Sequence, residues 1–225
     1  MSEAPSKRRD IPQIMMRLER SGMFLSISVL IGNGDGTFKP QVTYATGSAP
    51  TSLVVGDLKS NKGADLVVAD QGSNEVSVLR GNGDGTFKTH VTYPTGTAPY
   101  GVAIGNFNAD GARDVAVTNL GSSTVSVLLA NGNGTFKAQT THATGSHPYF
   151  VAVADLNNDL IADLVVANNN VNTLSVLRGN GNGTFQSQVT YPTGAMTTRY
   201  GDAEDMTSPD RRKDLEEFFS GLVSG

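Results

Sequence analysis

Gly-Asn-Gly-Asp-Gly-Thr-Phe, at residues 32–38, returns unchanged at residues 81–87. Variants of the same turn follow at residues 130–136 and 179–185. The closing phenylalanines stand at 38, 87, 136 and 185, so each step is 49 residues, without insertion or deletion. Self-similarity at a fixed period of this length is typical of repeat architectures, in which each copy is one structural unit. The chain is therefore predicted to fold as a row of similar units.

Two further motifs keep the same 49-residue step. Tyr-Ala-Thr-Gly at 44–47 returns with substitutions at 93–96, 142–145 and 191–194, and Asp-Leu-Val-Val at 65–68 returns as related segments at 114–117 and 163–166. The register is lost before about Ser26 and after Gly194, since Glu204 and Arg212 stand in unrelated surroundings. The repeat region therefore covers residues 26–194, or 169 residues and about 3.45 copies.

Each copy contains four β-rich runs bounded by turn residues. In one copy they are expected at Tyr100–Gly105, Asp114–Thr118, Thr124–Leu129 and Phe136–His142. The Asn-Gly and Asp-Gly pairs between the last two runs are strong hairpin signals. Four antiparallel strands per repeat make one propeller blade, whereas solenoids of shorter repeat need fewer strands. The prediction is an all-β fold of propeller blades, with a half blade at 26–47 and blades at 48–96, 97–145 and 146–194.

Composition excludes several classes of function. The net charge of -4 argues against a nucleic-acid partner, which requires a basic face. The absence of Cys excludes disulfides and thiolate metal sites. No segment approaches the ~20 apolar residues of a membrane helix. The apolar run Met23–Ile31 is short, and it is interpreted as a strand because no small-residue cleavage site follows it.

The pattern at residues 54–57, 65–68, 76–79 and 81–87 resembles the FG-GAP or VCBS-type repeat of integrin α-subunit propellers and many bacterial surface proteins. The resemblance covers residues 26–194. It implies a seven-bladed propeller with Ca²⁺ in loops between the first two strands of its blades. It also implies adhesion or binding of a protein or carbohydrate ligand, and an extracellular or cell-surface location, although the chain has no recognisable signal peptide.

The same resemblance implies ligand residues for Ca²⁺, with side chains at the first, third, fifth and ninth places of the loop and a carbonyl at the seventh. In the third copy these are Asp155, Asn157, Asp159 and Asp163, with the carbonyl of Ile161. In the second copy they are Asn106, Asn108, Asp110 and Asp114, with the carbonyl of Ala112. Such oxygen-rich loops suit a hard cation, but Asp and Asn also form turns without any ion.

The individual loops depart from the family pattern in different ways. Leu160 replaces the sixth-place Gly of the third copy, whereas the second copy keeps Gly111 and has fewer carboxylates. The first copy offers Asp57, Asn61 and Asp65, but Lys59 occupies its third place, where an ammonium group cannot coordinate a cation. Ca²⁺ is therefore expected in the 155–163 and 106–114 loops and not in the 57–65 loop.

The residues give little support to catalysis. The three histidines, His90, His142 and His147, lie in strands or connections, and no nucleophile-elbow motif occurs. The predicted function is a non-catalytic, Ca²⁺-stabilised module for binding or adhesion. Two alternatives stay open, namely an accessory repeat region of a secreted hydrolase and a truncated scaffold without a ligand.

The flanks of the repeat, residues 1–25 and 195–225, are expected to carry short helices. One is predicted within Ile11–Arg20 and one over 209–222, where Leu215, Phe218, Phe219 and Leu222 recur at helical spacing. A propeller closes with four to eight blades. The incomplete count leaves three arrangements open: an open arc capped by the helices, a homodimer joined through open blade edges, or a truncated fragment.

Overall fold

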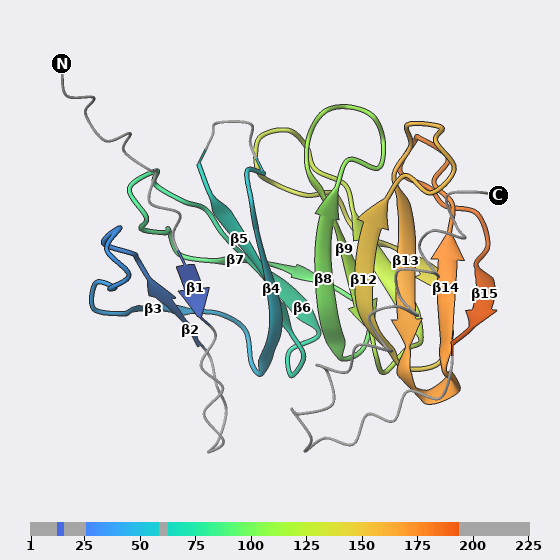
Figure 1. Cartoon of the computed structure of the whole chain (residues 1–225), viewed down its shortest axis with the longest axis horizontal. Coiled ribbons are helices and arrows are strands. Elements are labelled where there is room, and N and C mark those ends of the chain that lie inside the picture. Colours follow the sequence, from blue (N-terminus) through green and yellow to red (C-terminus); the bar gives the residue numbers. More distant parts are fainter. Residues whose placement is uncertain (1–12, 16–25, 59–62, 194–225) are drawn as a thin grey trace.

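The structure is a computed structural model that describes residues 13–15, 26–58 and 63–193 (Figure 1). Apart from one 3-10 turn, Asn169–Val171, all of its regular elements are strands. The strands form three four-stranded antiparallel sheets and one three-stranded sheet. Figure 1 shows these sheets side by side in an open row. The prediction of all-β propeller blades with four antiparallel strands is confirmed.

The three four-stranded sheets are called blades 1, 2 and 3. Blade 1 consists of β4 (Pro50–Gly56), β5 (Asp65–Asp70), β6 (Glu75–Leu79) and β7 (Val91–Pro94). Blade 2 consists of β8 (Pro99–Gly105), β9 (Asp114–Asn119), β10 (Thr124–Leu128) and β11 (Thr140–Ala143). Blade 3 consists of β12 (Pro148–Ala154), β13 (Asp163–Asn168), β14 (Thr173–Leu177) and β15 (Val189–Pro192). Equivalent strands thus keep the 49-residue register of the sequence.

The remaining sheet, called the first sheet, consists of β1 (Gln13–Met15), β2 (Ser26–Leu30) and β3 (Val42–Ala45). Strands β2 and β3 are the third and fourth strands of a blade, as the half blade at 26–47 predicts. The helix expected within Ile11–Arg20 is wrong for Gln13–Met15, which pairs with β2 in the register Gln13↔Leu30 and Met15↔Ser28. Pairing satisfies a β2 edge that would otherwise be open. The helix expected over 209–222 lies outside the described residues.

The fourth strand of each blade starts later than the sequence predicts. In blade 2 the expected run begins at Phe136, but Phe136 forms an isolated bridge with Ala130, and β11 begins at Thr140. The bridge closes the hairpin through bonds from Asn131 N to Thr135 O and from Lys137 N to Leu129 O. The chain then leaves the ladder for three residues, where the Gln139 side chain accepts a bond from Ser126 Oγ.

Apolar side chains fill the spaces between neighbouring sheets. Within β5, Leu66 and Val68 pack towards the first sheet, whereas Val67 and Ala69 pack towards blade 2. Alternate residues of a strand point to opposite faces, so a strand buried on both faces is continuously apolar. A third cluster joins blades 2 and 3 in the same way. The core is therefore divided into layers, each shared by two adjacent sheets.

An aromatic pair marks each of these layers. The phenylalanine that closes a hairpin turn packs edge-on against a ring of the preceding sheet. The pairs are Tyr44–Phe87 at 5.4 Å between ring centroids, Tyr93–Phe136 at 5.3 Å, and His142–Phe185 at 5.3 Å. These edge-to-face contacts fix each blade at the same position on its neighbour. Among the described residues, no helix is long and apolar enough to cross a membrane.

Candidate functional site

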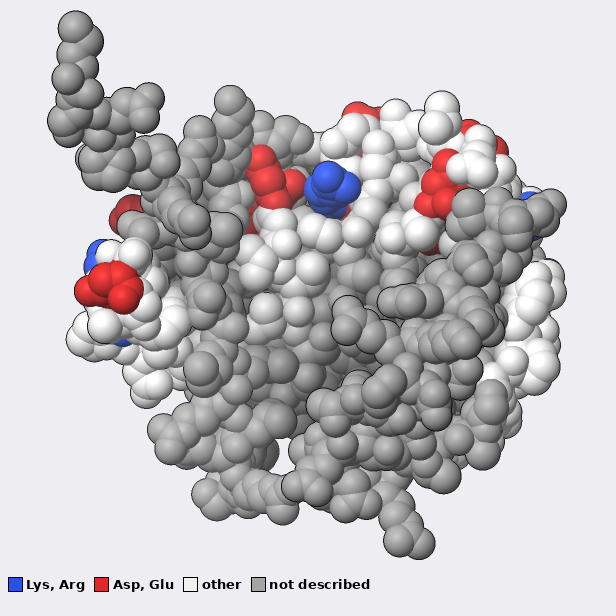
Figure 2. All heavy atoms as spheres, in the orientation of Figure 1, with Lys and Arg blue, Asp and Glu red and all other residues white. Residues whose placement is uncertain are grey.

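The three candidate loops connect the first and second strands of the blades. They follow β4, β8 and β12, and β8 contacts both β4 and β12. The second and third loops lie at the same end of the molecule as the end of β4 and the start of β5 (Figure 1). In Figure 2 acidic side chains are spaced along that end rather than gathered at one point. Within the described part of the chain, no three Asp, Glu or His side chains converge as a metal-binding group.

The ninth-place aspartates do the same structural work in all three copies. Asp65, Asp114 and Asp163 are 0–1% exposed. One carboxylate oxygen of each accepts a hydrogen bond from the second residue of its loop, and the other accepts one from the first residue of the hairpin turn. The donors are the N–H groups of Leu58 and Gly81 at 3.1 and 2.8 Å, Phe107 and Ala130 at 2.8 Å each, and Leu156 and Gly179 at 3.1 and 2.9 Å.

This pair of hydrogen bonds to the backbone is a role that the sequence does not reveal. The spacing of the aspartate from the hairpin is constant, but the chain alone does not show which N–H groups meet the carboxylate. Burial raises the pKa of Asp114, an effect opposed by the N–H groups of Ala130 and Phe107 and reinforced by Asp110. Each ninth-place carboxylate therefore joins the loop to the hairpin of its own blade.

The second loop holds an acceptor without a partner. The Asn106 Oδ1 atom is buried and has no hydrogen bond. Nearby, the Asn108 side-chain amide donates to Asp110 Oδ2 at 2.8 Å, and Ala112 N donates to Asp110 Oδ1 at 2.8 Å. Gly111, at φ 84°, supplies the left-handed turn of the loop. A buried, unpaired amide oxygen is unfavourable and is usually satisfied by water or an ion.

The third loop closes on itself through its own hydrogen bonds. Asp155 accepts bonds from the N–H groups of Leu160 at 2.8 Å, Asp159 at 3.2 Å and Asn157 at 3.3 Å. Desolvation opposes ionisation of Asp155, but these N–H groups outweigh it and hold its pKa below the usual value. Asp159 Oδ1 in turn accepts a bond from Ile161 N at 2.8 Å. This loop keeps its turn by the ordinary chemistry of Asp and Asn.

Leu160 is the strained residue of the third loop. It adopts φ 66°, and its side chain is 94% exposed. Left-handed backbone costs a residue with a Cβ about 1–2 kcal/mol, and the exposed side chain recovers nothing by packing. We expect Leu160→Gly to stabilise the fold by about 0.5–1 kcal/mol, as measured by urea denaturation. Gly111→Ala, the matched change in the second loop, should destabilise; equal effects of the two substitutions would contradict this account.

Of the first loop the structure describes Asp57 and Asp65, whereas Lys59 and Asn61 lie outside the described residues. An open groove of about 560 Å³ separates the second and third loops. Its lining combines the apolar Ile104, Phe107, Val153 and Leu160 with the polar Asn106, Arg113 and Asp155. The groove thus brings together the first-place residues of the two loops that match the family pattern best.

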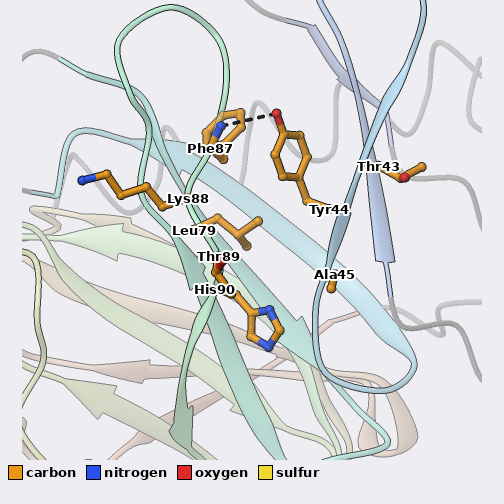
Figure 3. A pocket seen from close by; sticks show the side chains of 8 residues that line it. All are labelled: Thr43, Tyr44, Ala45, Leu79, Phe87, Lys88, Thr89 and His90. Atoms are coloured by element: carbon orange, nitrogen blue, oxygen red, sulfur yellow. Dashed lines mark hydrogen bonds between the residues drawn. The ribbon is translucent and has the colours of Figure 1, made fainter.

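A smaller hollow of about 200 Å³ lies between the first sheet and blade 1 (Figure 3). Tyr44 and Phe87 border it, and the Phe87 N–H donates to the Tyr44 hydroxyl at 3.3 Å. His90 lines its floor, and its Nδ1 atom is buried without a hydrogen bond. The hollow therefore belongs to the packing interface between the first sheet and blade 1.

Blade 1 carries Asp70, Ser77 and His90 at places where blade 2 carries Asn119, Ser126 and Gln139. In blade 2 the Asn119 amide donates to Ser126 Oγ at 2.7 Å, and that hydroxyl bonds to the Gln139 side chain. In blade 1, Ser77 Oγ is fully buried and accepts a bond from Gly47 N at 3.0 Å. Ser77 Oγ thus links blade 1 to the segment that follows the first sheet.

The other histidines also have structural surroundings. His142 packs against Phe185, and burial lowers the pKa of its imidazole. His147 Nδ1 lies 3.0 Å from Ser146 Oγ and 2.8 Å from the Asn170 amide. Neither lies with the groups of the three candidate loops.

The profile of the FG-GAP-like repeat family matches residues 59–117, 106–166 and 155–207, which together take in more than half of the chain. The three successive matches confirm the resemblance drawn from the sequence. The last match extends beyond Gly194, where the 49-residue register ends. No protein with a curated description matches the sequence.

Solved structures similar to the chain are related in fold. A protein from Lactobacillus plantarum is 16% identical, with a TM-score of 0.55 and coverage of 74% of this chain and 49% of that one. A protein from Desulfotomaculum acetoxidans is 16% identical, with a TM-score of 0.54 and coverage of 81% and 63%. Streptogramin B lyase is 20% identical, with a TM-score of 0.52 and coverage of 84% and 57%. The chain thus spans about half to two thirds of these propeller-like chains.

Proposed function

Because the chain belongs to the FG-GAP-like repeat family, we propose that it is a non-catalytic, Ca²⁺-stabilised propeller module that binds a protein or carbohydrate ligand in adhesion. The observation that carries the Ca²⁺ part is the buried, unpartnered Asn106 Oδ1 at the first place of the second loop. A cation at this loop would satisfy that oxygen. Family membership supports the binding part.

The second loop would hold the cation through oxygen atoms, which Ca²⁺ prefers in sets of six to eight. The side chains are Asn106, Asn108 and Asp110, with the carbonyl of Ala112 and the carboxylate of Asp114. The Asn108 side chain now donates to Asp110 Oδ2 and accepts a bond from Asp110 N. A half turn of the amide would exchange both bonds and present the oxygen where the nitrogen now lies. Asp114 uses one lone pair of each oxygen for the backbone and keeps others for a ligand.

The third loop offers a weaker case on its geometry, although it has more carboxylates. Asp155 already accepts three N–H bonds, and Leu160 strains the turn. The ligands of a cation in this loop would be Asp155, Asn157, Asp159 and Asp163, with the Ile161 carbonyl. Binding would be less favourable than in the second loop, because the first-place oxygen atoms already have hydrogen-bond donors. We rank the 106–114 loop first, the 155–163 loop second and the 57–65 loop last.

Calorimetric titration of the chelator-treated chain with CaCl₂ tests the cation site. We expect saturable binding, and at 100-fold excess over Kd a stabilisation of about 2.7 kcal/mol. Asp110→Asn should weaken Ca²⁺ binding by about tenfold or more, because it removes a carboxylate from the loop. Asp84→Asn is the matched control, since Asp84 is an exposed carboxylate that serves a hairpin turn by accepting bonds from Thr86. Absence of binding, or equal affinity in Asp110→Asn, would refute the site.

The binding part needs a separate experiment. A glycan array and a panel of hydrolase substrates, both applied to the purified chain with and without chelator, distinguish a binding module from an enzyme. We expect retention on specific glycans and no turnover. Hydrolysis of a panel substrate would contradict the non-catalytic assignment, and no response in either assay would refute a carbohydrate ligand.

A further inference from the structure

At each end of the row of sheets, the described residues include one ring of an aromatic pair without its partner ring. In the three internal layers the hairpin phenylalanines, Phe87, Phe136 and Phe185, are 7–8% exposed. The phenylalanine at the same place in the first sheet, Phe38, is 42% exposed. Tyr191 of blade 3 stands where Tyr44 and Tyr93 stand in the preceding sheets, and it is 36% exposed. Among the described residues, neither Phe38 nor Tyr191 has the ring that its register predicts.

A second kind of contact joins neighbouring sheets: a side chain of one sheet lies against the hairpin turn of the next. In the described part of the chain, each half of this contact is present at one of the two ends of the row without the other. The side chains of Ile31 and Leu129 lie against Gly85 and Gly183 in the turn of the next blade. At the layer between blades 1 and 2, Arg80 reaches the same turn and donates from Nη2 to Gly134 O. The residues in register with these at the ends are Arg178 and Gly36, and both are exposed.

The outer face of blade 3 carries apolar residues at the positions that pack against the next sheet in blade 1. In blade 1 the face towards blade 2 carries Val67, Ala69 and Val76, each at most 1% exposed. The residues in register on blade 3 are Val165, Ala167 and Leu174, which are all partly exposed. Apolar faces of this kind are stabilised by burial of about 25 cal/mol per Å².

We propose that a second copy of this chain covers both ends, so that two chains join head to tail and close one ring. Tyr191 of each chain then packs edge-on against Phe38 of the other, and Arg178 donates to the carbonyl of Gly36. A head-to-tail interface makes a closed ring when its rotation closes. This proposal is independent of Ca²⁺ and of the ligand.

The number of sheets favours two copies. The described residues of each chain contribute three four-stranded sheets and one three-stranded sheet, so that those of two chains supply eight, within the four to eight blades of a propeller. The chain also covers 49% to 63% of the propeller-like chains described above. Each copy therefore corresponds to about half of a closed ring.

Light scattering of the full chain over a range of concentrations gives the first test. We expect a plateau at twice the chain mass of 23.6 kDa. A monomer at every concentration would overturn the proposal and would point to cover from the chain's own terminal residues. A mass that keeps growing with concentration would overturn ring closure, because it indicates an open filament.

Complementation distinguishes a lost interface from a lost fold. Phe38→Asp and Tyr191→Asp each spoil both interfaces of a homodimer, and each alone should self-associate about tenfold more weakly or worse. A mixture of the two variants retains one native interface and should form a heterodimer. Val91→Asp, on an exposed outer strand of blade 1, is the matched control and should leave the dimer unchanged. Failure of the mixture to associate would refute the pairing of Phe38 with Tyr191.

Crosslinking tests the same pair directly, because the chain has no Cys of its own. The internal pair Tyr93→Cys with Phe136→Cys calibrates the reagent: the shortest bismaleimide that links it within one chain is then used. With that reagent Phe38→Cys/Tyr191→Cys should give a covalent dimer. An intrachain link would overturn the proposal, as would the absence of any link at concentrations where light scattering shows the double variant to be a dimer.

Discussion

Asp114→Ala is expected to lower the free energy of unfolding by about 2–5 kcal/mol, because two buried N–H donors lose their acceptor. These donors are Phe107 N and Ala130 N, both 2.8 Å from the carboxylate. Their separation in sequence means that the loss frees the loop from the hairpin of the same blade. Urea denaturation in the presence of a chelator measures the effect without any contribution from Ca²⁺.

Two substitutions serve as controls for Asp114. Asp114→Asn keeps one acceptor oxygen and should cost roughly half as much. Asp110→Ala, in the exposed part of the same loop, should change the stability of the chelator-treated chain by about 1 kcal/mol or less. If Asp114→Ala were harmless in chelator and costly in Ca²⁺, the carboxylate would act through the ion and not through the backbone.

Asp70→Asn is expected to stabilise the protein by about 1–3 kcal/mol at pH 7. Burial, opposed by the neighbouring Ser77 hydroxyl, raises the pKa of Asp70 from 3.8 to about 6. The folded state thus binds a proton more tightly than the unfolded state, and native stability falls as pH rises from about 4 to about 6. The neutral amide removes this penalty at neutral pH and gives no such gain near pH 4.

Blade 2 provides the reciprocal experiment. Asn119 occupies the place of Asp70 and donates to Thr124 Oγ1 at 3.0 Å and Ser126 Oγ at 2.7 Å. Asn119→Asp should destabilise at pH 7 and recover on acidification. Thermal unfolding between pH 4 and pH 8 follows both variants. A pH profile of Asp70→Asn parallel to that of the parent would show that Asp70 is not the titrating group.

The blades could be predicted because the turns and the strands agree in register. The turn ending at Phe87 and the apolar strand at Leu66–Val68 each recur after 49 residues, and both faces of that strand are apolar. Such agreement between local pattern and period leaves few alternatives. The strand Gln13–Met15 could not be predicted, because three residues outside the repeat carry no periodic signal, and pairing with β2 decides their conformation.

The loops show where residue type is insufficient. The sequence indicates oxygen-rich loops between the first two strands of the blades, but it does not show whether a carboxylate of the loop bonds to the backbone or to a cation. The Asp163 carboxylate accepts hydrogen bonds from Leu156 N and Gly179 N because folding brings the hairpin beside the loop. Similarly, the unpaired oxygen of Asn106 depends on burial by neighbouring segments, which a linear motif does not contain.

Because the core is divided into layers, each sheet can open locally without the others. Each apolar cluster belongs to two sheets, so the sheets stabilise one another as nearest neighbours in a linear array. Among the residues whose side chains the structure describes, the layer between the first sheet and blade 1 has the fewest buried apolar residues. Amide hydrogen exchange would then be fastest at the two ends of an isolated chain and slowest in β9 of blade 2. Joining the ends would remove that gradient, since a closed array has no terminal member from which to fray.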